Sequence, residues 1–192
     1  MSNKQRAKKE KFTQPEKKSK GPLIGGVIAL GIAILAGVFF WGGGGDADKY
    51  AIATIGETVS YENSVIPQVK VDPVTAENGK VVVTTLSELK EKKFIYTQYR
   101  APGKILPLTA LVQPDGGVVV AVSVCEPCNS DSFRVDGKYL ACNACNSIWD
   151  IKTFKGISGG CEDFPPDRLI YTQNGDNIEV DEAILNAWQP RV

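Results

Sequence analysis

The sequence predicts a mainly β protein, in which a small antiparallel β domain follows a single N-terminal transmembrane helix and ends in a short C-terminal helix. Three observations support this fold class. A run of twenty uncharged residues lies near the N-terminus, short β-rich segments separated by turn residues follow from residue 80, and all five cysteines lie in the second half of the chain.

The first 21 residues form a basic tail, with eight Lys and Arg against two Glu, although the whole chain has no net charge. Basic residues beside an apolar segment are typical of the cytoplasmic side of a membrane. Nucleic-acid binding is the rival interpretation, but Phe12 is the only aromatic residue of the tail and the body is acidic. We therefore expect 1–21 to be a basic cytoplasmic tail, and we expect no nucleic-acid partner.

Residues 22–42 are predicted to be the transmembrane anchor. The uncharged run ends in Phe39, Phe40 and Trp41, which suit the membrane interface. About twenty apolar residues are needed for a helix to cross the hydrocarbon core, and no small-residue cleavage site follows closely, so an uncleaved anchor is favoured over a signal peptide. The sequence thus predicts a single-pass protein of the cell membrane, with a cytoplasmic N-terminus and an extracytoplasmic C-terminal domain.

Small residues recur at every fourth position of this segment, namely Gly25, Ala29, Ala33 and Gly37. Such a stripe allows close approach of a second helix, which would favour a homodimer or a membrane protein partner. Glycine and alanine are also common in membrane helices without any such role, so both interpretations stay open.

The rest of the chain divides into a linker or extended arm at 43–79 and a cysteine-rich β domain at 80–192. Two hairpin turns are expected at Asp136-Gly137 and Asn174-Gly175. Asp181 is expected to cap the C-terminal helix, which would run to Trp188. A helical turn is expected near 87–89, and strands are expected at 80–85, 94–100, 105–112, 118–124, 133–135, 138–140, 148–151, 169–173 and 177–180.

The cysteines follow the spacing C-x2-C-x13-C-x2-C-x15-C, at Cys125, Cys128, Cys142, Cys145 and Cys161, and the chain has no histidine. Each C-x-x-C can supply two sulfurs to one metal, and a hairpin between the pairs would bring them together. Thiolates suit zinc or an iron–sulfur cluster. Structural disulfides are an alternative outside the cytoplasm, and thioredoxin-like redox chemistry is a third.

The chain after Cys145 resembles the second half of a Rieske-type domain, with an aromatic strand, a glycine turn, the prolines Pro165 and Pro166, and a closing hairpin. The fold is therefore expected to be Rieske-like in part. Rieske centres use two histidines on one iron, which this sequence cannot supply. A two-iron cluster held here by four thiolates would have a low reduction potential.

The two C-x-x-C pairs, the Gly159-Gly160-Cys161 run and the following prolines together resemble the FtrD-like membrane iron–sulfur family, over residues 80 to about 180. The resemblance implies a membrane-bound protein, often linked to iron uptake through a permease and extracytoplasmic electron carriers. It implies cluster ligands at Cys125, Cys128, Cys142 and Cys145, with Cys161 as a fifth thiol of open role. The adjacent glycines would let the loop of Cys161 approach the site closely.

These observations favour a membrane-anchored extracytoplasmic iron–sulfur protein, with a [2Fe–2S] cluster as the favoured cofactor, that passes electrons to a permease or redox protein in the membrane. The alternatives are a zinc-stapled structural or interaction module and a metal carrier that supplies a transporter. Without histidine or another catalytic constellation, an electron carrier is expected rather than an enzyme that converts a substrate.

Overall fold

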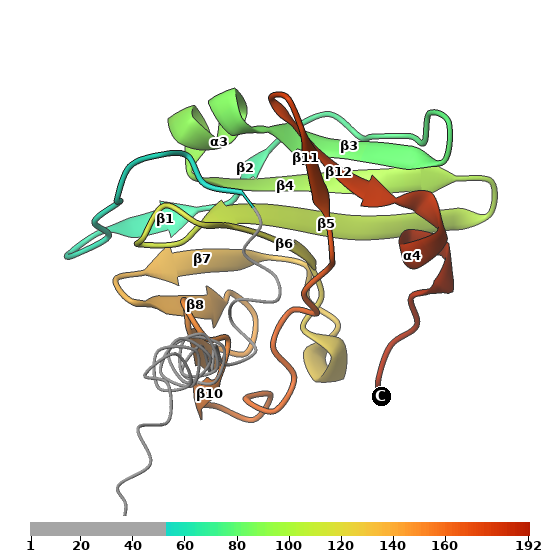
Figure 1. Ribbon diagram of the computed structural model, residues 1–192. Coiled ribbons are helices and arrows are strands. Elements are labelled where there is room, and N and C mark those ends of the chain that lie inside the picture. Colours follow the sequence, from blue (N-terminus) through green and yellow to red (C-terminus); the bar gives the residue numbers. More distant parts are fainter. Residues whose placement is uncertain (1–52) are drawn as a thin grey trace, which may run out of the picture. The chain divides into compact units, whose positions relative to one another are not determined.

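The structure is a computed structural model that describes residues 53–192 (Figure 1). The predicted tail, anchor and small-residue stripe lie outside the described residues. Within residues 53–192, no helix has the length and apolar character needed to span a membrane. The elements are β1 (Val65–Pro67), β2 (Val69–Lys70), β3 (Lys80–Thr85), α3 (Leu86–Lys92), β4 (Phe94–Ala101), β5 (Lys104–Val112), β6 (Val118–Val122), the 3₁₀ turn η1 (Glu126–Cys128), β7 (Phe133–Asp136), β8 (Tyr139–Cys142), β9 (Ile148–Asp150), β10 (Gly156–Ser158), β11 (Thr172–Asn174), β12 (Asn177–Asp181) and α4 (Glu182–Ala187).

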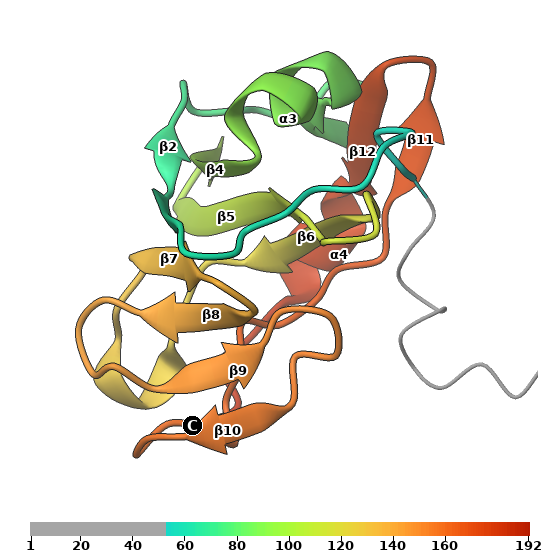
Figure 2. The same cartoon turned by 90° about the vertical axis from the view of Figure 1, so that its left-hand side faces the viewer.

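The strands form three sheets, in the orders β2-β4-β5-β6, β11-β12-β3 and β1-β7-β8-β9-β10. The pairs are antiparallel except for β2 with β4. Figures 1 and 2 show the sheet of β4, β5 and β6 between the other two, with α3 on the side of β3 and the β7–β10 strands on the opposite side. The expected mainly antiparallel β domain with a short C-terminal helix is confirmed.

The middle sheet is buried on both faces, which explains the unbroken apolar sequence of β6. Val118, Val120 and Val122 belong to a first core, whereas Val119 belongs to a second. Successive side chains of a strand point to opposite faces, so a strand between two cores needs apolar residues at every position. The end of β5 follows the same rule, since Ala110 faces the first core and Leu111 the second.

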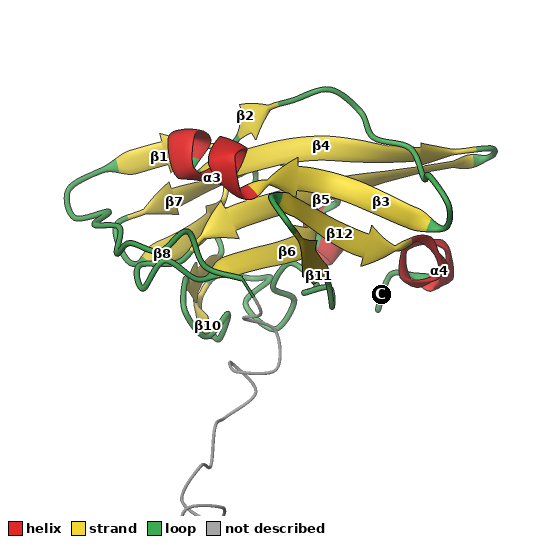
Figure 3. Ribbon diagram, turned by 45° about the horizontal axis from the view of Figure 1, so that its top comes forward, coloured by secondary structure: helices red, strands yellow, loops and turns green. Residues whose placement is uncertain are grey.

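The first core lies between the middle sheet and the β11-β12-β3 sheet, and both helices close it. Leu89 of α3 and Leu185 of α4 are fully buried in it. Thr85 caps α3 by accepting a hydrogen bond from the backbone N–H of Glu88, as expected of a threonine at this position. Figure 3 shows the two short helices against an otherwise β architecture.

Asp181 precedes α4, as the sequence predicts, but its side chain does not cap the helix. Its carboxylate instead pairs with Lys80 at 2.7 Å across the β12–β3 ladder. The helix itself ends at Ala187, one residue before the predicted end.

Residues 53–79, which the sequence analysis assigns to an arm, are extended and pack along the body. β1 pairs with β7, and β2 pairs with β4. Ala53 and Ile55 are buried in the first core, and Tyr61 in the second. This segment therefore contributes one strand to the middle sheet, one strand to the sheet of β7–β10, and buried side chains to both cores.

Both predicted hairpins form, but each turn lies one residue later than expected. Asp136 pairs with Tyr139, so the loop residues of the first hairpin are Gly137 and Lys138. In the second hairpin Asn174 pairs with Asn177, which again makes glycine the first loop residue. Gly137 and Gly175 have φ values of +56° and +61°, and glycine first with positive φ is the pattern of type II′ turns.

Candidate metal centre

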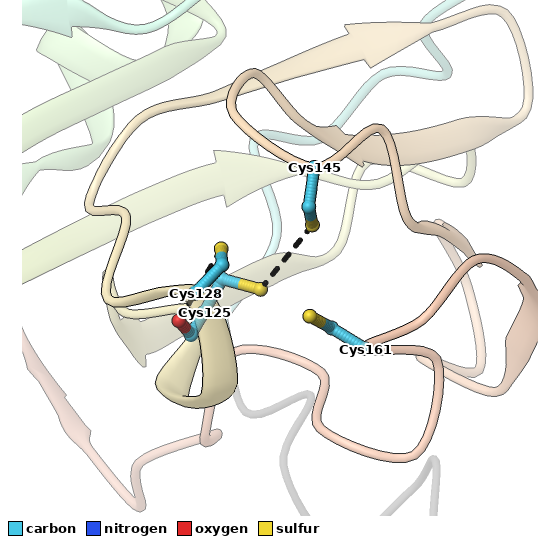
Figure 4. A group of neighbouring side chains, drawn as sticks. All are labelled: Cys125, Cys128, Cys145 and Cys161. Carbon is cyan, nitrogen blue, oxygen red and sulfur yellow. Dashed lines mark hydrogen bonds between the residues drawn. The ribbon is translucent and has the colours of Figure 1, made fainter.

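The cysteines lie on three loops that meet beside the second core. Cys125 precedes η1 after β6 and Cys128 ends it, Cys142 ends β8, and Cys145 lies in the turn before β9. Cys161 comes from the turn after β10. Figure 4 shows the sulfurs of Cys125, Cys145 and Cys161 directed into the space between these loops.

The two C-x-x-C loops are repeats of one turn with the sequence C-x-x-C-N-S. In the first, the N–H of Cys125 donates to the carbonyl of Ser130 at 2.7 Å, and in the second the N–H of Cys142 donates to that of Ser147 at 3.0 Å. Asn129 and Asn146 follow the second cysteine of each pair, with φ of +53° and +56°. Asparagine is one of the few residues that adopts this left-handed conformation readily, so it can close such a turn.

Four thiols form a compact group, because the Sγ atoms of Cys125, Cys128, Cys145 and Cys161 all lie within 4.8 Å of one another. The Sγ atoms of Cys125 and Cys145 are 3.8 Å apart. Two thiolates on one tetrahedral metal ion, each bonded at about 2.3 Å, are separated by about 3.8 Å. The spacing of this pair therefore suits two ligands of a single metal atom.

Cys142 joins this group from its edge. Its Sγ lies 3.7 Å from that of Cys128, a second pair at the same spacing. Both close pairs combine one cysteine from each C-x-x-C motif. The structure thus brings all five predicted site residues together.

Cys161 is held in place by Ser147 and by a glycine. The backbone N–H of Cys161 donates to Ser147 Oγ at 2.9 Å. Gly159 has a φ of +111°, and a Cβ at this position would lie 2.4 Å from Ser147 Oγ. The predicted close approach therefore depends on Gly159, whereas Gly160 has open space around the corresponding position.

Hydrogen bonds to sulfur follow the pattern of a metal-binding turn. Burial raises the pKa of Cys142, while the backbone N–H groups of Cys145 and Ala144 and the hydroxyl of Ser130 act in the opposite direction. Burial also acts to raise the pKa of Cys145, but hydrogen bonds from the hydroxyl and backbone of Ser147 outweigh it and lower the pKa to about 6. Such donors favour the thiolate form, which is the form that binds metals.

The surroundings of Cys125 oppose its ionisation. Burial, together with the neighbouring thiols of Cys128, Cys142, Cys145 and Cys161, raises the pKa of Cys125. Several adjacent thiolates repel one another in a low-dielectric site, and a cation among them removes this cost. The donor set is soft sulfur throughout, which fits zinc or iron and not magnesium or calcium.

All five cysteines are free thiols, so the described residues contain no disulfide. The 3.7 and 3.8 Å separations far exceed the bonded distance of about 2.05 Å. The geometry therefore favours a metal centre over the structural disulfides considered from the sequence.

The site is buried on one side and accessible on the other. Cys125, Cys142 and Cys161 belong to the second core, whereas Cys128 and Cys145 are half-buried. Trp149 is fully buried in the same core, and its Nε1 donates to the carbonyl of Glu162 at 2.8 Å. This indole anchors the loop that carries Cys161 and packs as a core residue.

An ion pair between the buried Glu126 and the partly exposed Arg191 also ties the C-terminal segment to the site. The Glu126 carboxylate, 1% exposed, accepts hydrogen bonds from the Arg191 side chain, with Nη2 at 2.5 Å and Nε at 2.6 Å. The same guanidinium donates to the carbonyl of Pro165 at 2.7 Å. Arg191 thus connects the first C-x-x-C loop with the loop that follows Cys161.

Four residues of the site were not predicted from the sequence, namely Asn129, Ser130, Asn146 and Ser147. The signal was present, because the hexapeptides CEPCNS and CNACNS are visibly repeats of each other. The Glu126–Arg191 pair carried no such signal, since it joins residues 65 positions apart.

The fold and the site define a β-rich protein with a candidate metal site whose ligand candidates are all cysteines. The chain matches the model of the family described as membrane iron–sulfur containing protein FtrD-like over residues 89–192, so it belongs to this family, and the predicted resemblance is confirmed. A ferredoxin of Sphingomonas yanoikuyae B1 is similar at 23% identity, over 41% of this chain and 76% of that one, with a TM-score of 0.34. Comparison with curated proteins finds no match. The partly Rieske-like character of the domain stays a prediction.

Proposed function

We propose that the protein is a membrane-anchored iron–sulfur electron carrier, whose cysteine centre receives one electron from a donor and passes it to a redox partner at the membrane. The convergence of five thiols in a member of an iron–sulfur family carries this proposal. A bound iron–sulfur cluster would supply reversible one-electron chemistry. The chain's own residues hold the ligands, donate hydrogen bonds to the sulfurs and exclude water from the inner side.

The uneven burial of the thiols supports electron exchange with a partner. Cys128 and Cys145 are the half-buried ligand candidates, and the neighbouring residues Pro127, Asn143 and Ala144 are exposed. A partner could therefore approach the sulfurs directly at this edge. The opposite side is closed by Trp149 and the second core.

A [2Fe–2S] cluster is the cofactor that we propose. The two close sulfur pairs, Cys125 with Cys145 and Cys128 with Cys142, each have the spacing of two ligands on one iron. A cluster with two iron atoms and four thiolates would use two such pairs, one on each iron. Cys161 would then be a fifth thiol next to the cluster.

Zinc is the second candidate, and one observation favours it. The group of four sulfurs within 4.8 Å includes Cys161 and omits Cys142, as a single tetrahedral ion with four thiolates would require. In that case the protein would be a zinc-stapled interaction module or a carrier that supplies metal to a transporter.

The setting of the protein is also proposed. The predicted anchor at 22–42 would place the domain outside the cytoplasm, beside a permease or redox protein of an iron-uptake system. The stripe of Gly25, Ala29, Ala33 and Gly37 would support a homodimer or the contact with that partner. Replacing Gly25 and Gly37 by leucine should then weaken the membrane complex, and an unchanged complex on native gels would contradict this role.

Redox titration of the full-length protein, purified without oxygen in detergent, tests electron transfer. We expect visible absorption that bleaches on one-electron reduction, an electron paramagnetic resonance signal in the reduced state, and full recovery on reoxidation. The Cys128→Ser variant should lose the signal. A coloured protein that takes up no electron would contradict the carrier function while leaving iron binding intact.

A further inference from the structure

Ser147 lies between two of the thiol-bearing loops and is fully buried. Its Oγ accepts a hydrogen bond from the backbone N–H of Cys161 at 2.9 Å and lies 3.3 Å from Cys145 Sγ. A thiolate has no proton to give. When Cys145 is a metal ligand, the hydrogen bond between these two groups must therefore run from the serine hydroxyl to the sulfur.

The surroundings of Ser147 fix this orientation. Gly159 packs so tightly against it that an added Cβ would lie 2.5 Å from the Cα of Ser147. The carbonyl of Ser147 is also engaged, since it accepts from the N–H of Cys142. Neither water nor another side chain is needed to complete the bonding of this hydroxyl.

We propose that Ser147 is a positioning residue that raises the reduction potential of the iron–sulfur centre through its hydrogen bond to Cys145, and that it sets the place of Cys161 at the same time. This inference rests on the proposed function. Reduction adds one negative charge to the centre, and a hydrogen-bond donor on a ligand sulfur stabilises that charge. Removing the donor should make reduction less favourable.

The first repeat offers an internal comparison. Ser130 is the equivalent serine of CEPCNS and acts to lower the pKa of Cys142, but its hydroxyl donates to the carbonyl of Ser132 at 3.5 Å. It is half-buried and also accepts from the backbone N–H of Ser132 at 3.3 Å. Water and backbone compete for this hydroxyl, so the Ser130→Ala variant should change the potential less than Ser147→Ala.

The test is the midpoint potential of anaerobically purified full-length variants, measured with mediators and matched for iron content. Ser147→Ala should lower the equilibrium constant for reduction about tenfold, which is about 59 mV for one electron. Ser147→Thr keeps the hydroxyl and should retain the wild-type potential. Ser123→Ala is the matched control, because Ser123 is equally buried but hydrogen-bonds Gln68 and Asp131 instead of a cysteine.

An unchanged potential in Ser147→Ala at wild-type iron content would overturn the role of the serine alone. If Ser147→Ala does not fold, Ser147→Thr provides the test. A shifted potential in Ser147→Thr, which retains the hydroxyl, would also contradict the proposal. Wild-type protein without iron would overturn the proposed function and this inference with it.

Discussion

The two faces of the middle sheet carry cores of different kinds. The first core consists mainly of aliphatic and aromatic side chains. The long strands β4 and β5 lie beside it, and two helices cover it. The second core includes Cys125, Cys142 and Cys161 among its buried members, and its outer strands β7 to β10 have three or four residues each. The first core is thus an ordinary apolar interior, whereas the second core contains buried thiols among its apolar side chains.

This difference leads us to expect that a metal bound by the cysteines would be part of the fold on its own side. Short strands and loops bury little apolar surface, and small units of this kind commonly gain their stability from a bound metal. Polar side chains join the two sides: among them, Tyr61 donates to the carbonyl of Val112, Gln113 donates to that of Ile151, and Gln68 bonds both Thr109 and the N–H of Phe133. Because the first core has its own buried apolar cluster, it should stay folded when the β7–β10 side is disturbed in spite of these bonds.

The largest effect is expected from removing the bound metal. In the Cys125→Ser variant we expect metal content to fall below a tenth of the wild-type value and amide exchange to rise in β7 to β10, because the loops lose their common ligand. Amide exchange in β4, β5 and β12 should stay slow. Hydrogen–deuterium exchange measures this. An equal loss of amide protection in both sets of strands would contradict the difference between the two cores.

Next in size is the loss of the buried indole. Trp149→Ala should cost about 3–5 kcal/mol of unfolding free energy and should also reduce metal retention, because the Cys161 loop loses the bond from Trp149 Nε1 to Glu162. Leu108→Ala is the control from the first core, at about 2–5 kcal/mol with metal retention unchanged while folded. Denaturant unfolding and metal analysis of both variants make this comparison.

A smaller effect is expected at the ion pair of Glu126 and Arg191. Arg191→Ala leaves the buried Glu126 carboxylate without its partner, but the arginine side chain is 38% exposed, so water can replace part of the contact. We expect a loss of about 1–3 kcal/mol, below that for a fully buried pair. The exposed pair of Lys80 and Asp181 supplies the control, where Lys80→Ala should cost under about 1 kcal/mol. Similar costs for the two variants would show that Arg191 does not anchor the site loops.

The smallest effect concerns the junction between the cores at high pH. Burial raises the pKa of Tyr61 from its ordinary value of 10.0 to about 12. The folded state therefore favours the neutral phenol, and this stabilisation is complete below pH 10 and is lost as the pH rises toward 12. Relative to Tyr61→Phe, the wild type should lose unfolding free energy over that interval. A difference between the two proteins that stays constant across it would contradict this prediction.

Much of the structure around the first core could be predicted from the sequence, because its strands and turns are indicated by short apolar runs and by turn residues. The valines of β6 predicted a strand, but its burial on both faces depends on two other sheets. β1 and β2 were not predicted as strands, since their few residues are ordered by pairing with β7 and β4, far along the chain. The thiol group could be predicted from the cysteine spacing and the glycines before Cys161, whereas the hydrogen bond that the N–H of Cys161 donates to Ser147 depends on the folded turn.

The most direct test is the iron, acid-labile sulfide and zinc content of full-length protein purified without oxygen, together with its visible absorption. We predict a brown protein with iron and sulfide in nearly equal amounts, and with a reduced-state resonance signal that disappears in Cys125→Ser. A colourless protein that contains one zinc ion would contradict the iron–sulfur assignment and leave the zinc-stapled module in its place.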